Sequence, residues 1–269
     1  MPIRLIAIDM DGTLLNEHNL LTPATIATVK EAKTRGIKIV LCSGRPLTGL
    51  QPFFEPLGLV DDGDYAITYN GAMVQRADTG EILLQHSLTY AEFLELTTLA
   101  TKLGVHSHAE DEARMYTPDR DISRYSVRES YLVNMPLSYR QPDEFAQDKR
   151  FAKVMYIDDP NFLAQVQAKI PASFFDRYYF VNSEPFFLEA LNKQASKGNA
   201  VKDLAAKLGY GLDEVMAIGD QANDLPMIKV AGTGVAMGNA IPEVKAAAQF
   251  TTATNAEDGV AQAIRNYAF

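Results

Sequence analysis

Two separated stretches of the chain alternate short apolar runs with helix-like segments, and this alternation restricts the possible folds more than any other feature. Residues 3–8 are nearly all apolar and stop at an aspartate, as a short buried strand does. Thr22-Pro23 then marks a helix start, with Thr22 as the N-cap and Pro23 in the first helical position. Residues 37–42 form the next apolar run. Strand, helix and strand in this order predict a parallel sheet with right-handed crossovers.

The same alternation returns after Lys197, where a helix to residue 208 precedes a strand over residues 215–218. Between the two stretches, predicted strands follow one another with few helices, which is typical of an α+β module. The sequence therefore predicts an α/β fold, in which residues 1–85 and 195–269 form a Rossmann-like, doubly wound parallel sheet. We expect residues 86–194 to be an α+β domain inserted into it.

Composition excludes several classes of partner. Of the 269 residues, 47% are hydrophobic, which is enough for a sizeable core. The 25 basic and 34 acidic residues give a net charge of −9, which disfavours nucleic acid and anionic membranes as partners. The single cysteine, Cys42, forms no internal disulfide. Because we find neither a signal-like leader nor an apolar run of ~18 residues, we expect a cytoplasmic protein.

Residues that carry chemistry gather where the predicted parallel strands end or where a neighbouring helix begins. Four clusters share this position: Asp9-Met10-Asp11-Gly12-Thr13, Ser43-Gly44-Arg45, Lys197, and Gly219-Asp220 with Asn223-Asp224. Open α/β sheets bind ligands at this edge, near the point where the strand order reverses. Converging carboxylates repel one another unless a cation neutralises them. Since oxygen ligands select a hard divalent ion, the pattern predicts a Mg²⁺ site.

The first cluster places two carboxylates close together in the sequence. Asp9 and Asp11 are two residues apart, so on a continuing strand both side chains would point to one face of the sheet. Gly12 indicates that the chain turns just after them. We therefore expect the two carboxylates to flank one reacting centre. An acidic loop at a strand end is the alternative explanation for this cluster taken alone.

Together the four clusters resemble the four motifs of the haloacid dehalogenase (HAD) superfamily, and the inserted module resembles the type-2 cap of its Cof-type phosphatases. The similarity extends over essentially the whole chain and includes the segment Tyr69-Asn70-Gly71-Ala72. It implies a HAD-like core with an inserted cap domain. It also implies an enzyme that hydrolyses phosphoric monoesters with Mg²⁺ as its cofactor.

The resemblance implies a role for each matching residue. Asp9 would attack phosphorus and form an aspartyl-phosphate, and Asp11 would protonate the leaving oxygen and later activate water. Lys197 would neutralise charge between Asp9 and the phosphoryl group. The implied phosphate-binding residues are Met10, Ser43, Gly44, Lys197 and Asn223, and the implied metal-binding residues are Asp9, Asp11, Asp220 and Asp224. Of these, Asp11 would use its backbone carbonyl, and Asp224 would support the metal through water.

The function that these roles imply is a Mg²⁺-dependent phosphatase of small phosphorylated metabolites, with sugar phosphates as the first expectation. A phosphomutase would use the same aspartates but return the phosphoryl group to the substrate, so release of free phosphate separates the two. A non-enzymatic aspartyl-phosphate switch would keep its phosphoryl group for minutes rather than seconds. No sequence feature bears on the oligomeric state.

Several other residues have structural explanations beside functional ones. Ser43 also suits a helix N-cap, and we expect Arg45 to pair with an acid rather than act in catalysis. Cys42 lies too near Arg45 for a loop that wraps a thiolate, so we expect it to be a buried core residue. His106 and His108 alternate on one strand face, but a metal pair is disfavoured because no third ligand is evident.

The inserted module is expected to act as a lid that chooses substrates without supplying catalytic groups. All the catalytic candidates lie in residues 9–45 and 197–224, outside the module. An aspartyl-phosphate at an open sheet edge nevertheless needs a closing element that keeps bulk water away. The polar residues of the module that we expect to contact a sugar hydroxyl or a phosphate are His108, Tyr116 and Arg120.

Overall fold

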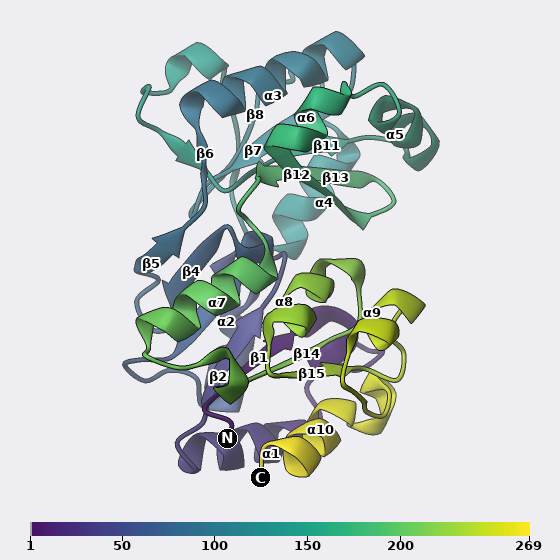
Figure 1. Cartoon of the computed structure of the whole chain (residues 1–269). Helices are drawn as coiled ribbons and strands as arrows, with labels where there is room; N and C mark the ends of the chain where they lie inside the picture. The colour runs from purple at the N-terminus through teal and green to yellow at the C-terminus, as the bar shows by residue number, and fades with distance from the viewer. Residues whose placement is uncertain (1) are drawn as a thin grey trace. The chain divides into compact units, whose positions relative to one another are not determined.

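The computed structural model describes residues 2–269, which form two compact units (Figure 1). The first, here called the core unit, comprises the described residues up to Gln85 together with Ser196–Phe269. The second, here called the cap unit, comprises His86–Ala195.

One eight-stranded sheet forms the centre of the core unit, in the order β16-β15-β14-β1-β2-β3-β4-β5. The strands from β16 to β3 pair in parallel, whereas β4 and β5 run antiparallel at one edge. Because β1 lies between β14 and β2, the chain winds outward in both directions from β1, which makes its carboxyl end a switch point of the topology. The strand bounds are Leu5–Asp9 (β1), Lys38–Cys42 (β2), Tyr65–Thr68 (β3), Met73–Arg76 (β4), Ile82–Gln85 (β5), Val215–Gly219 (β14), Thr233–Ala236 (β15) and Phe250–Thr251 (β16).

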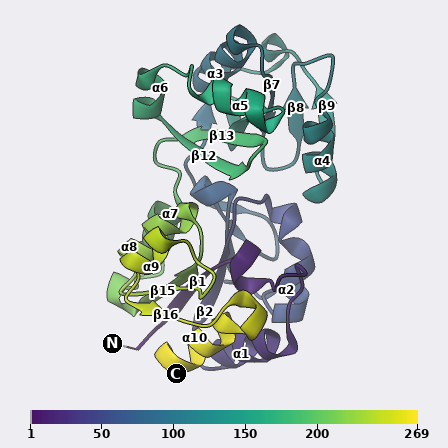
Figure 2. The same ribbon diagram turned by 90° about the vertical axis from the view of Figure 1, so that its right-hand side faces the viewer.

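Helices cover both faces of this sheet (Figure 2). On one face α1 (Pro23–Thr34) packs against α2 (Gln51–Leu57) and α10 (Gly259–Tyr267). On the other face α8 (Leu225–Val230) packs against α7 (Lys197–Lys207) and α9 (Pro242–Ala247). Two covered faces explain why the central strands have apolar residues at consecutive rather than alternate positions.

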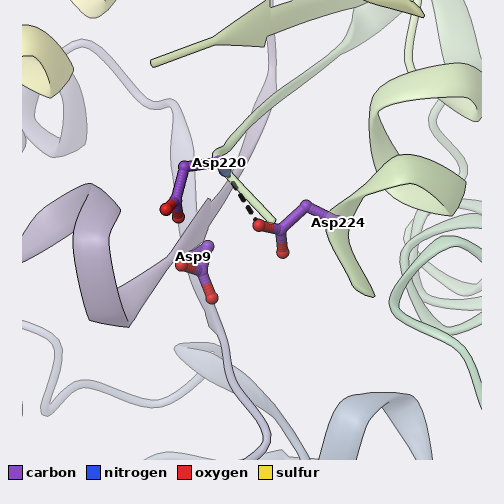
Figure 3. Close-up of side chains that lie close together, drawn as sticks. All are labelled: Asp9, Asp220 and Asp224. Carbon is purple, nitrogen blue, oxygen red and sulfur yellow. Dashed lines mark hydrogen bonds between the residues drawn. The ribbon is translucent and has the colours of Figure 1, made fainter. Parts of the chain in front are cut away.

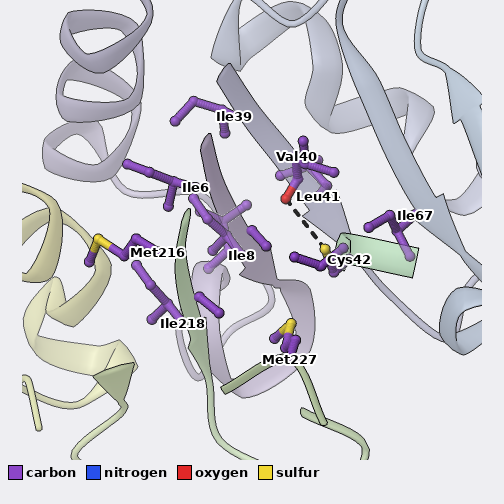
Figure 4. Close-up of a cluster of buried hydrophobic side chains, with 14 of the residues drawn as sticks. Ile6, Ile8, Ile39, Val40, Leu41, Cys42, Ile67, Met216, Ile218 and Met227 are labelled. Carbon is purple, nitrogen blue, oxygen red and sulfur yellow. Dashed lines mark hydrogen bonds between the residues drawn. The ribbon is translucent and has the colours of Figure 1, made fainter. Parts of the chain in front are cut away.

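The apolar side chains of the central strands form one continuous core (Figure 4). All five residues of β1 are buried, and so are all five of β14. Ile6 and Ile8 of β1 lie beside Met216 and Ile218 of β14, as the parallel register requires. The polar ends of these strands are therefore fixed in place by a packed core, which gives the residues that follow them a rigid base.

The cap unit is an α+β module with a six-stranded sheet in the order β12-β13-β11-β7-β8-β9. Its neighbouring strands run antiparallel except for the parallel pair β8 and β9. A separate two-stranded sheet joins β6 to β10. The strand bounds are Leu88–Thr89 (β6), His106–Glu110 (β7), Met115–Thr117 (β8), Leu137–Tyr139 (β9), Arg150–Phe151 (β10), Lys153–Ile157 (β11), Tyr178–Glu184 (β12) and Phe187–Asn192 (β13).

The two faces of the cap sheet differ in polarity. On one face Val154 and Tyr156 of β11 pack into an apolar cluster that includes Phe93 and Leu163. These partners come from α3 (Tyr90–Leu103) and α5 (Pro160–Gln167). The other face carries a buried polar cluster, formed by His108, Glu110, Lys153 and Glu189. The remaining helices of the unit are α4 (Arg124–Leu132) and α6 (Ala172–Arg177).

The structure confirms the fold class and most of the expected elements. Thr22 caps α1 by accepting the amide of Thr25, and Asn70-Gly71 lies in the turn between antiparallel β3 and β4. Four short strands and one short α-helix were not expected from the sequence: β6, β9, β10, β16 and α6. Among residues 2–269, no helix combines the length and the apolarity that a membrane crossing requires.

Candidate active site

The site begins at the carboxyl end of β1, where Asp9 is the last residue of the strand. Neighbouring chain segments bring two further carboxylates beside it, from Asp220 after β14 and Asp224 in the turn before α8 (Figure 3). One oxygen from each of the three residues lies within 4.8 Å of the others, and all three residues are buried. The structure therefore brings together three of the four aspartates that the strand-end motifs predict to converge, and Asp11 is not among them.

Lys197 supplies the only cation that is hydrogen-bonded to this cluster within residues 2–269. It is the first residue of α7, and it is fully buried. Its Nζ donates to Asp9 Oδ1 at 2.5 Å and to Asp224 Oδ1 at 2.6 Å. Although burial disfavours an ammonium group, the two carboxylates raise the pKa of Lys197 above its usual value. Lys197 therefore carries a positive charge in this site.

Asp224 is held from several sides, which explains its complete burial. Its Oδ2 accepts the backbone N–H groups of Asp220 and Gln221, at 2.9 and 3.0 Å. Its Oδ1 accepts from Lys197. Gly219 makes this approach possible, because a Cβ there would lie 2.5 Å from the Cβ of Asp224. Asp224 therefore fixes both a backbone turn and the lysine.

The net negative charge of the cluster favours the binding of a further cation. Three carboxylates and one ammonium group leave two negative charges in a buried place. Burial raises the pKa of Asp9 well above its usual value, and the carboxylates of Asp224 and Asp220 add to this, against the opposing effect of Lys197. Burial also raises the pKa of Asp220. An oxygen-rich cluster of this charge matches a divalent cation such as Mg²⁺.

Two residues that follow Asp9 set the position of Asp220. Thr13 donates its hydroxyl to Asp220 Oδ1 at 2.8 Å. Gly12 has φ +80°, and a Cβ at that position would lie 2.6 Å from Asp220 Oδ2. Asn239, which sequence reasoning did not single out, donates to the Gly12 carbonyl at 2.8 Å. Gly12 is therefore required both for its backbone conformation and for the space that it leaves.

Asp11 lies apart from the buried carboxylates. The chain leaves the strand directly after Asp9, two residues earlier than a strand that continues through Asp11, and Met10–Leu14 form a helical turn. The Asp11 side chain is 51% exposed and forms a two-point ion pair with Arg45, at 3.0 and 2.5 Å. The expectation that Arg45 pairs with an acid is therefore confirmed.

The segment after β2 approaches the site through its backbone and one small side chain. Ser43 is buried, and its Oγ accepts the amide of Arg45 at 3.1 Å. No helix begins there, since the next helical turn starts at Leu47 with Pro46 in the cap position, so the N-cap explanation of Ser43 was wrong. Gly44 packs against Asn70, whose Nδ2 would lie 3.1 Å from a Cβ at Gly44.

Asn70 is the site residue to which sequence reasoning gave no role, because its segment was named only as part of the family resemblance. Its backbone N–H donates to the Ser43 carbonyl at 2.9 Å, and its Oδ1 accepts from Asn223 Nδ2 at 3.0 Å. It is buried and has φ +55°. The next residue, Gly71, approaches the backbone of Ser196 and Lys197 so closely that a Cβ would overlap it. The turn thus joins three of the four motif segments.

The remaining sequence candidates lie elsewhere. Cys42 is fully buried, and burial raises the pKa of its thiol, so it is a core residue as expected. In the cap unit, His106 contacts Asp158 and His108 contacts Ser126 and Glu110. Within residues 2–269, the carboxylate cluster of the core unit is the only group of three or more His, Cys, Asp or Glu side chains placed to hold one metal ion.

The two other cap candidates are hydrogen-bonded within the cap unit. Tyr116 donates its hydroxyl to Asp111 Oδ2 at 2.9 Å. Arg120 is exposed and donates to the Tyr139 hydroxyl at 3.4 Å. Neither contact involves a residue of the carboxylate cluster.

Comparisons with known proteins show the family to which the chain belongs. The model of the family described as haloacid dehalogenase-like hydrolase matches residues 6–264. The Bacillus subtilis protein YxeH, provisionally named a phosphatase, is 49% identical over 261 residues, which are 97% of each chain. A haloacid dehalogenase-like hydrolase from Bacteroides thetaiotaomicron is 32% identical with a TM-score of 0.86, covering 98% of this chain and 99% of that one.

A further solved structure is that of a HAD subclass IIB sugar phosphatase, BT4131. It superimposes with a TM-score of 0.78 at 25% identity, and 98% of each chain is covered. The matched region in every case contains both units of the chain. The protein therefore belongs to the haloacid dehalogenase-like hydrolases and is a phosphatase of that superfamily.

Proposed function

We propose that this phosphatase hydrolyses small phosphomonoesters, sugar phosphates in particular, with Mg²⁺ and through an aspartyl-phosphate on Asp9. The observation that carries the proposal is the buried cluster of three carboxylates with Lys197 at the end of β1. A buried arrangement of this kind is costly unless it binds a cation. The likeness to the sugar phosphatase BT4131 supports the substrate class.

The residues present fit Mg²⁺ by charge and by donor type. The carboxylates of Asp9 and Asp220 would hold it, with the backbone carbonyl of Asp11. Asp224 already accepts three hydrogen bonds, so its proposed role is to support the metal indirectly, through water and through the placement of Asp220. When bound, the ion supplies positive charge that offsets the repulsion between these carboxylates and a phosphate dianion.

In the proposed reaction, the Asp9 oxygen that faces the substrate attacks phosphorus, and the bond from phosphorus to the leaving alkoxide breaks. A protonated Asp11, released from its ion pair with Arg45, gives its proton to that alkoxide. Water then attacks phosphorus, Asp11 takes a proton from it, and the bond from Asp9 to phosphorus breaks. Free phosphate and an unmodified enzyme result.

The other proposed roles concern the phosphoryl oxygens. The amides of Met10 and Gly44, the Ser43 hydroxyl and the Asn223 side chain would donate hydrogen bonds to them. Lys197 would reduce the repulsion between Asp9 and the phosphoryl group. Phosphoryl transfer requires mainly positioning and charge neutralisation, and these groups supply both.

The test of this function is release of inorganic phosphate from a panel of phosphorylated sugars and from p-nitrophenyl phosphate, with and without Mg²⁺. We expect turnover with Mg²⁺, its loss in EDTA and its return when Mg²⁺ is restored. Full activity in metal-free protein would overturn the metal assignment. Isomerised sugar phosphate without free phosphate would indicate a phosphomutase, and a phosphoenzyme that persists for minutes would indicate a switch.

The role of Asp11 has a separate test that depends on the leaving group. Asp11→Asn should lower kcat by roughly 10²–10⁴ for alkyl phosphates, as expected for loss of general acid–base help. The loss should be smaller for p-nitrophenyl phosphate, whose leaving group needs no proton. Equal losses for both classes of ester would contradict the proton-donor role.

We also propose that the cap unit selects the substrate without contributing catalytic groups. The carboxylate cluster and Lys197 belong entirely to the core unit. Substitution of an exposed polar cap residue, such as Arg120→Gln, should change kcat/KM unevenly among sugar phosphates while sparing p-nitrophenyl phosphate. A common reduction for every substrate, the generic ester included, would show that the cap takes part in the chemistry.

A further inference from the structure

A cavity of about 500 Å³ lies within the cap unit, on the segments around β8 and β9 and on the chain that follows them. Tyr116 of β8 and Ser138 of β9 are directly opposed in the parallel register, so both project from the same face of the sheet. Phe145 packs edge-on against Tyr116, at 5.0 Å between ring centroids. The residues that line the cavity are Arg114, Tyr116, Ser138, Arg140, Glu144, Phe145, Ala146 and Lys149.

The side chains that line this cavity have a net positive charge, although the net charge of the whole chain is −9. Arg114, Arg140 and Lys149 contribute three cations, and Glu144 contributes the one carboxylate of the lining. Asp111 forms an ion pair with Lys149 and neutralises the charge of that lysine. A local excess of positive charge in an acidic protein favours an anionic ligand at this place.

Lys149 and Tyr116 are both held in place by Asp111 in the absence of a ligand. Lys149 Nζ donates to Asp111 Oδ2 at 2.6 Å, and the hydroxyl of Tyr116 donates to the same oxygen. Asp111 is itself buried and fixed by the backbone amides of Ala113 and Arg114. Holding these groups reduces the conformational entropy that binding would otherwise cost.

Arg114 is positioned in a similar way on the β9 side. Its Nη1 donates to Ser138 Oγ at 2.8 Å. Its Nε and Nη2 groups make no hydrogen bond within residues 2–269, so they remain as donors for a ligand. A planar guanidinium group with two unused donors suits a phosphate, which accepts hydrogen bonds at two oxygens at once.

We propose that this cavity, here called the cap anion site, binds the phosphate group of a small phosphorylated molecule, separately from the carboxylate cluster of the core unit. Arg114, Arg140 and Lys149 hold the phosphate. The rings of Tyr116 and Phe145 contact the body of the molecule. The volume lies in the range of pockets that hold small ligands.

The test measures binding of inorganic phosphate to the intact chain by calorimetry in EDTA and at low salt. Without a metal ion, the carboxylates of the core unit repel phosphate, so the cap anion site dominates the titration. Arg114→Gln with Arg140→Gln should weaken phosphate binding at least tenfold. Lys169→Gln, at an exposed lysine of the same unit, should change it less than twofold.

Denaturant unfolding establishes that each variant is folded before its titration is compared. Should the double variant fail to fold, Arg140→Gln alone serves as the test, since Arg140 is exposed. It should still weaken binding severalfold, and added salt should weaken binding to the wild type. Identical titrations of the wild type and the arginine variants, or no phosphate binding to the wild type, would overturn the proposal.

Discussion

Replacing Asn70 by glycine and by alanine separates its two structural contributions to the site. Its backbone has φ +55°, and its side chain accepts a hydrogen bond from Asn223 while packing against Gly44. Glycine keeps the backbone conformation but removes the side chain. Alanine removes the side chain and also disfavours the conformation.

General energetic costs give the expected changes in stability and in kcat/KM. A left-handed conformation costs alanine roughly 1–2 kcal/mol. Glycine avoids this cost, but it loses more backbone conformational entropy on folding, which costs roughly 0.5–1 kcal/mol. The alanine variant should therefore be about 1 kcal/mol less stable than the glycine variant. Both lose the hydrogen bond from Asn223, about 1 kcal/mol, so kcat/KM should fall roughly fivefold in both if that bond positions Asn223 for the substrate.

The assay combines urea unfolding with phosphate-release kinetics. Asn134 provides a matched control, because it has φ +52° but is exposed and lies in the cap unit. Alanine and glycine at position 134 should differ in stability in the same direction and leave kcat/KM unchanged. Wild-type kcat/KM in either Asn70 variant would refute the reasoning that this side chain positions the site.

Two further substitutions test the packing of each unit. Gly12→Ala should abolish Mg²⁺-dependent turnover, because φ is +80° at this position and the new Cβ would overlap the Asp220 side chain. Calorimetry should show weakened Mg²⁺ binding to this variant. Binding as tight as that of the wild type would contradict the prediction. Lys153→Met should destabilise the protein by about 3–5 kcal/mol in urea unfolding, because it leaves the buried Glu110 and Glu189 without their cation. A decrease in the free energy of unfolding below about 1 kcal/mol, as expected at an exposed lysine, would show that Lys153 is not coupled to Glu110 and Glu189.

The fold was predictable because its main signals are local and strong. The apolar runs that became β1 and β2 cannot satisfy any amphipathic pattern, so burial on both faces is their only stable state. The helix cap at Thr22 is equally local, and the structure has it. By contrast β9 and β16 have three and two residues, and such short strands depend on their neighbours rather than on their own sequence.

The candidate site was predictable where a residue stands at the end of a strand. Asp9 and Asp220 follow directly from the topology, since the carboxyl ends of parallel strands meet at one edge. Asn70 was given no role because an Asn-Gly pair is explained by the turn alone, and only the tertiary contacts with Ser43 and Asn223 show its second role. Pairing of a residue with a distant partner has no local sequence signal.

The measurement that tests the central proposal most directly is identification of the phosphorylated residue. Acid quenching during turnover preserves an acyl phosphate, and borohydride reduction converts the modified aspartate to homoserine, which mass spectrometry of the N-terminal peptide locates. The account predicts homoserine at position 9 in the wild type and none in Asp9→Asn, which should also lack turnover. Turnover without an acyl phosphate, or with the label on Asp11, would contradict it.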